Sequence, residues 1–130
     1  MNRIQELIAK RERVAEWYKE RLTEIPGLDV PTLVSSTTCM SWFVYVVRFA
    51  PGIDRDEVAR RLGERRIPAR PYFLPIHLQP YMVTRFGYQP GDFPVTEDLG
   101  QRGLALPFSG VMSEAQVDIV CRALGEILPG

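Results

Sequence analysis

The chain has 130 residues, of which 45% are hydrophobic, and this length allows one globular domain with one core. Sixteen Lys and Arg residues balance sixteen Asp and Glu residues, and the resulting zero net charge argues against binding to nucleic acid or to an anionic membrane surface. The arginine pairs at 60–61 and 65–66 are therefore interpreted as a solvated helix face.

The sequence contains no apolar run near the roughly 18 residues that span a bilayer. Its charged first residues, 1–6, lack the apolar centre of a signal peptide, so we expect a cytoplasmic protein. Cys39 and Cys121 stand far apart without the spacing of a metal or redox site. We expect both cysteines to be small buried side chains in a reducing compartment.

Residues 2–25 show the apolar periodicity of a long amphipathic helix, which Pro26 and Gly27 end. The apolar positions recur at steps of three and four residues: Ile4, Leu7, Ile8, Val14, Ala15, Tyr18, Leu22 and Ile25. Such a broad apolar face needs a cover. Either the helix folds back on the rest of the chain or its partner is missing.

Residues 38–49 follow a connector rich in Pro, Ser and Thr, and their β-branched and aromatic side chains predict a strand. Both faces of this strand are apolar, so we expect it to be central and covered on both sides. Asp54 and Glu57 then have the spacing of a capping box at the start of a short helix. Residues 67–73 predict a short extended segment, which Pro68 and Pro71 confine to a sheet edge.

Residues 70–81, with the sequence RPYFLPIHLQPY, contain three prolines and the only histidine of the chain, His77. Proline fixes φ and lacks an amide donor, so neither an ordinary helix nor a central strand can run through this segment. We expect a rigid, extended loop that places side chains at a defined position.

Residues 81–98 predict an irregular segment with one or two helical turns, in which Pro94 begins a short helix. A short strand is expected at 104–106, and Ser113 with Gln116 forms a second capping box before a closing helix. The whole pattern predicts a single α+β domain over residues 1–130, with the long helix at 2–25 and an α/β core at 38–128. Its sheet should be small, three-stranded and mainly antiparallel, packed with helices.

No nucleophile elbow, metal-ligand cluster or phosphate-binding glycine loop is present in the sequence. His77 either bonds carbonyls within a tight loop or faces a polar or anionic ligand at a cleft. Arg70 is either a solvated charge or an anion clamp, and Tyr72 either covers the loop or contributes to a site. Lys10 and Lys19 both fall on the polar face of the first helix, and neither looks like a Schiff-base lysine.

Several sequence blocks resemble the C-terminal part of the DegT/DnrJ/EryC1/StrS sugar aminotransferases. They are the segments 70–81, 86–88, 91–97, 104–108, 113–116 and 120–124, together with the opening helix at 3–18. The resemblance covers nearly the whole chain and implies the small C-terminal domain of a fold-type I aminotransferase.

Members of this family use pyridoxal phosphate to move an amino group, typically from glutamate, to a keto sugar carried on a nucleotide, and they work as homodimers. Their large N-terminal domain supplies the Schiff-base lysine and has no counterpart here, so the resemblance implies that this chain holds no cofactor and is inactive alone. By position, His77 matches the family histidine that faces the active site and can contact the nucleotide-sugar substrate. Arg70 and Tyr72 lie in the same loop and are further candidates.

A different function remains open at this point. The chain could be a free-standing small-ligand-binding or protein-interaction module that dimerises through the apolar face of its first helix.

Overall fold

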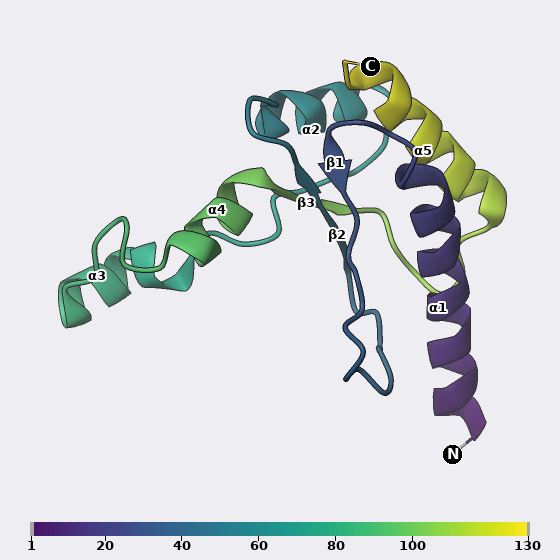
Figure 1. Ribbon diagram of the computed structural model, residues 1–130, viewed down its shortest axis with the longest axis horizontal. Coiled ribbons are helices and arrows are strands. Elements are labelled where there is room, and N and C mark those ends of the chain that lie inside the picture. Colours follow the sequence, from purple (N-terminus) through teal and green to yellow (C-terminus); the bar gives the residue numbers. More distant parts are fainter. Residues whose placement is uncertain (1, 130) are drawn as a thin grey trace.

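The computed structural model describes residues 2–129 and shows a three-stranded antiparallel sheet packed with helices, which confirms the α+β fold (Figure 1). Among these residues, no helix is long and apolar enough to cross a membrane. In chain order the elements are α1 (Asn2–Leu22), β1 (Leu28–Asp29), β2 (Tyr45–Phe49), α2 (Arg55–Glu64), the 3-10 helix η1 (Ile76–Leu78), α3 (Pro80–Phe86), α4 (Pro94–Arg102), β3 (Gly103–Leu106) and α5 (Glu114–Ile127).

The sheet has the order β1-β2-β3, and both strand pairs are antiparallel. Along β2, buried and half-buried side chains alternate, so that Tyr45, Val47 and Phe49 face the core while Val46 and Arg48 point to the opposite face. The paired residues are Leu28 with Phe49, Asp29 with Arg48, Tyr45 with Leu106, Val46 with Ala105, Val47 with Leu104, and Arg48 with Gly103.

The prediction of a central strand is confirmed. The predicted length of this strand is wrong, and so is the prediction that both of its faces are buried. It begins at Tyr45 and not at residue 38, and Trp42 just before it has a φ of 48°, which is incompatible with extended backbone. Val46 and Arg48 are only half-buried, so the second face of the strand is not fully covered by this chain.

The predicted edge strand at 67–73 is wrong except for one residue. Arg70 forms an isolated antiparallel bridge with Ala105, in which the N···O distances are 2.8 and 3.1 Å. Pro68 and Pro71 flank this bridge and have no amide hydrogen, so the pairing stops there. The third strand is instead β1, within the stretch that the sequence analysis treated as a connector.

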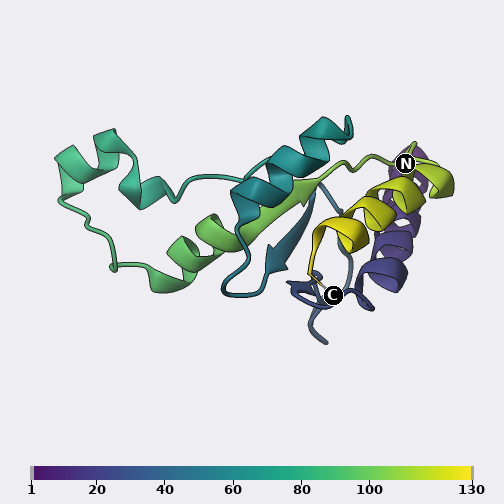
Figure 2. The ribbon, with the colours of Figure 1, turned by 90° about the horizontal axis from the view of Figure 1, so that it is seen from above.

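The helices α1 and α5 lie side by side against the sheet, and α2 packs against α5 and β3 (Figure 2). Tyr18 of α1 stacks on Tyr45 of β2 with 4.9 Å between the ring centroids, and its hydroxyl donates a hydrogen bond to the Pro107 carbonyl. Within the described part of the chain, twenty-one buried hydrophobic residues from these elements and the adjoining segments form one core.

The first helix ends at Leu22, three residues earlier than predicted, and only part of its apolar face is covered. Its buried residues are Val14, Ala15, Tyr18 and Leu22, all in the second half of the helix. In the first half, Ile4 and Leu7 are 62% and 51% exposed.

Three predicted helix starts are confirmed. The Asp54 side chain accepts hydrogen bonds from the amides of Asp56 and Glu57 at the start of α2. Ser113 and Gln116 form a reciprocal capping box at the start of α5. Pro94 is the first residue of α4.

The two cysteines differ in their surroundings. Cys121 is buried as expected, and burial raises the pKa of its thiol to about 12. The same expectation is wrong for Cys39, which is exposed because it lies in an irregular segment whose residues 32–41 are all exposed.

Residues 71–102 leave the core and form a projection, which we call the arm (Figure 1). It contains η1, α3 and α4, which is more helix than the one or two turns expected between residues 81 and 98. Of all side chains between residues 71 and 102, only that of His77 is buried. The arm is therefore built without an apolar core of its own.

Candidate functional site

The three predicted site residues lie along the route by which the chain enters the arm. Arg70 stands at the edge of the sheet next to β3, Tyr72 begins the arm, and His77 lies in η1. The Arg70 side chain is exposed, and within residues 2–129 it forms no ion pair. Tyr72 is 41% exposed and packs against the ring of Phe73.

His77 is 6% exposed and forms the centre of the arm. Its Nε2 atom lies 2.9 Å from Oε1 of Glu97, which belongs to the first turn of α4. Its ring packs against Phe93, with 4.7 Å between centroids, and meets the edge of Tyr88 at 6.3 Å. The histidine therefore connects the two ends of the arm, and whether it also contacts a substrate stays a prediction.

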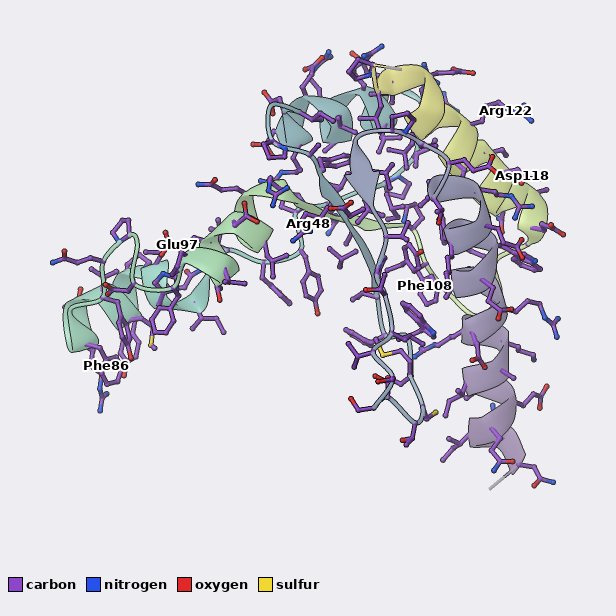
Figure 3. All side chains as sticks on the ribbon, viewed as in Figure 1. Arg48, Phe86, Glu97, Phe108, Asp118 and Arg122 are labelled. Carbon is purple, nitrogen blue, oxygen red and sulfur yellow. The ribbon has the colours of Figure 1, made fainter. Side chains whose placement is uncertain are left out.

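Glu97, on α4, is the hydrogen-bond partner of His77 (Figure 3). Its carboxylate accepts the Gly91 amide at 2.8 and 3.0 Å and the Phe93 amide at 3.3 Å, in addition to the bond from His77. The hydrogen bond from His77, followed by that from the Gly91 amide, lowers the pKa of Glu97 below its ordinary value. Gly91 itself has a φ of +96°, a conformation that other residues rarely adopt.

Glu97 is a candidate functional residue that no sequence pattern predicts. Twenty positions separate it from His77, and a pair so far apart leaves no periodic signal. The only available sign was that Glu97 ends one of the sequence blocks that carry the family resemblance, at 91–97.

Beside the arm, a hollow of about 460 Å³ opens against the sheet face that carries Val46 and Arg48. Tyr72 lines it, whereas Arg70 and His77 do not. Arg48 of β2 stands at this hollow and pairs with Asp29 at 3.0 Å (Figure 3). The lining residues are mostly apolar: Val46, Arg48, Tyr72, Phe73, Leu74, Pro75, Ile76, Thr96, Leu99, Gly100 and Gly103. The hollow is suited to apolar groups, and the one guanidinium at its side is paired with Asp29.

The residues of this chain do not fit a covalently bound pyridoxal phosphate. The Schiff base of such a cofactor needs a lysine, and the two lysines of the chain, Lys10 and Lys19, are both exposed on α1. Lys10 is paired with Glu6 at 3.0 Å on the helix surface. Residues 2–129 also contain no group of three or more His, Cys, Asp or Glu side chains that could hold a metal ion.

Known proteins match this chain along almost its full length. The spore coat polysaccharide biosynthesis protein SpsC of Bacillus subtilis is 32% identical over 134 residues, covering 100% of this chain and 34% of that protein. GDP-perosamine synthase of Caulobacter vibrioides is 32% identical over 133 residues, covering 98% of this chain and 34% of that enzyme.

Among solved structures, the aminotransferase TlmJ of Streptoalloteichus hindustanus superposes with a TM-score of 0.82 at 28% identity. The match covers 97% of this chain and 33% of TlmJ, so the chain spans about a third of the length of these relatives. The sequence profile of the DegT/DnrJ/EryC1/StrS aminotransferase family matches residues 1–125. The chain therefore belongs to the DegT/DnrJ/EryC1/StrS aminotransferase family.

Proposed function

We propose that this chain is the C-terminal, substrate-side part of a pyridoxal-phosphate-dependent nucleotide-sugar aminotransferase. The observation that carries the proposal is the family match over residues 1–125 in a chain that spans only about a third of its relatives. The intact enzyme would transfer an amino group from glutamate to a keto sugar attached to a nucleotide. GDP-perosamine synthase, whose name includes a nucleotide-linked sugar, is among the relatives that support this substrate class.

Catalysis by the isolated chain is not expected. Pyridoxal phosphate provides the electron sink of such reactions, and it must be held through a lysine and through contacts to its phosphate. Lys10 and Lys19 lie on the exposed surface of α1, far along the chain from the arm and its hollow. The large N-terminal domain would therefore supply the cofactor site.

The arm and the sheet face beside it would form the surface that meets this missing domain, in an enzyme that works as a homodimer. Phe73, Leu74 and Ile76 are each about 70% exposed, at 70%, 71% and 69%. A cluster of exposed apolar side chains at one place usually marks a contact surface. The proposed substrate-side residues are Tyr72, which lines the hollow, Arg70, which directly precedes the arm, and His77 in η1.

Reconstitution tests the proposal directly. The cofactor-binding domain would be taken from GDP-perosamine synthase of Caulobacter vibrioides. It would be combined with this chain and assayed for glutamate-dependent amination of a keto nucleotide sugar. We expect turnover only in the combined sample. A borohydride-trappable cofactor adduct at Lys10 or Lys19 that supports turnover by the chain alone would contradict the proposal.

A second candidate function rests on the uncovered half of α1. Ile4 and Leu7 are exposed on one side of this helix, and a second copy of the chain could cover them. The chain would then be an interaction or small-ligand-binding module. Light scattering after size exclusion, together with small-ligand titration, tests the module. A well-defined dimer that Leu7→Glu converts to monomer and that binds a small ligand saturably supports the module, whereas a monomer with or without this substitution contradicts it.

A further inference from the structure

The ring nitrogens of His77 have different surroundings. Nε2 lies 2.9 Å from the Glu97 carboxylate. Nδ1 has no hydrogen-bond partner within residues 2–129 and is not among the fully buried atoms that lack one. Glu97 is itself fixed from a second side, because the amides of Gly91 and Phe93 also donate to it. Four hydrogen-bond contacts thus determine where the carboxylate stands relative to the ring.

The chemistry of the pair determines where the ring proton lies. An ionised carboxylate can only accept hydrogen bonds, so the short contact requires a proton on Nε2. A neutral imidazole carries one proton, which leaves Nδ1 as an acceptor. A neutral His77 in this arrangement can meet a ligand only through that acceptor.

We propose that Glu97 is a positioning residue that fixes His77 as the Nε2–H tautomer and so presents Nδ1 as an acceptor to a donor group of the substrate. Suitable donors are the hydroxyl groups of a sugar or an N–H group. Phosphate oxygens are not suitable, because a fully ionised phosphate also only accepts. The assignment of the tautomer is independent of the proposed function, whereas the identity of the ligand rests on it.

The tautomer can be measured on the chain as it stands, because His77 is its only histidine. With ¹⁵N-labelled histidine, correlation spectra near pH 8 report which ring nitrogen carries the proton. We expect a protonated Nε2 whose hydrogen exchanges slowly with water and is therefore visible. A proton on Nδ1 would overturn the proposal.

Variants at Glu97 test the role of the carboxylate. Glu97→Ala should abolish the slowly exchanging Nε2–H signal, and Glu97→Gln should restore part of it because the amide oxygen still accepts. Asp98→Asn is the matched control, since Asp98 is the adjacent carboxylate on α4 and pairs with Arg102 instead. Survival of the signal in Glu97→Ala would overturn the positioning role.

The reconstituted enzyme tests the consequence for substrate binding. Glu97→Ala should raise KM for the keto nucleotide sugar about tenfold and leave kcat within about twofold, with Glu97→Gln closer to the unmodified chain. An unchanged KM would overturn the substrate part of the proposal. Failure of the reconstituted enzyme to aminate any keto nucleotide sugar would instead count against the proposed function, while the spectra would still decide the tautomer.

Discussion

The core and the arm of this chain are held together by different forces. All twenty-one hydrophobic residues that are buried within residues 2–129 lie outside residues 71–102, whereas the arm buries a single side chain, that of His77. In the core, removal of apolar surface from water supplies the stability. In the arm, a hydrogen-bonded cluster around Glu97 and the rings packed on His77 fix the path of the chain, and its apolar side chains are exposed or only half-buried.

This difference has a functional meaning. A segment with few buried apolar contacts opens at a lower free-energy cost than the core does. Segments that close over a ligand or a partner are usually of this kind. The core is therefore the more stable support, and the arm is the part of the chain that we expect to open first.

The largest effect is expected in the core. Leu124 of α5 is fully buried, and Leu124→Ala removes buried methyl groups and leaves a cavity. We expect a loss of about 3 kcal/mol in the free energy of unfolding, measured by urea denaturation. Ile119→Ala on the same helix is the control, because Ile119 is 58% exposed and its loss should change stability by less than about 0.5 kcal/mol. Equal effects at the two positions would mean that the core is not packed as described.

A smaller effect of opposite sign is expected at Tyr45. Its hydroxyl is buried and has no hydrogen-bond partner among the described residues, which carries a desolvation cost. Tyr45→Phe should therefore stabilise the core by about 1 kcal/mol, or raise the melting temperature by about 4 °C. Tyr18→Phe is the matched comparison and should destabilise, because the Tyr18 hydroxyl donates to the Pro107 carbonyl. A destabilised Tyr45→Phe would show that this hydroxyl has a partner in solution.

The capping box of α5 offers a test at the edge of the core. Ser113→Ala removes the side-chain acceptor of the Gln116 amide and should cost about 1 kcal/mol in the free energy of unfolding. Ser113→Asp keeps an acceptor and should stay close to the original stability. If Ser113→Ala unfolds at the same urea concentration as the unmodified chain, the cap contributes nothing to the core.

Much of the core could be predicted from the sequence because its signals are local. Helical periodicity identified α1 and α5, and the cap residues Asp54 and Ser113 marked the correct helix starts. The two-residue strand β1 was missed, since two residues are too few for any alternation of polarity to appear. Cys39 was placed wrongly inside the protein because the strand was extended over residues 38–44, which are irregular.

The arm could be predicted only in part. Proline content correctly indicated a segment that is neither long helix nor sheet, and Pro94 correctly marked a helix start. The contact of His77 with Glu97 depends on how α4 folds back toward η1, and that is a tertiary property with no local signal. The histidine was therefore recognised as a candidate, while its carboxylate partner was not.

The smallest effect on global stability, and the sharpest separation of the two regions, is expected from acid. The pKa of Glu97 in the folded arm lies below its ordinary value of 4.5, mainly because of the bond from His77. The ionised Glu97 carboxylate thus stabilises the arm fully above about pH 4.5, and this stabilisation is lost as the pH falls below that value. Amide exchange in α3 should accelerate on acidification before exchange in α5 does, after correction for the intrinsic effect of pH.

Asp98 also has a lowered pKa through its pair with Arg102, so Asp98→Asn serves to separate the two carboxylates. In Glu97→Gln, which has no carboxylate at this position to protonate, the acid step in α3 should disappear, whereas in Asp98→Asn it should remain. An arm and a core that open together at every pH would mean that the cluster around Glu97 does not hold the arm independently of the core.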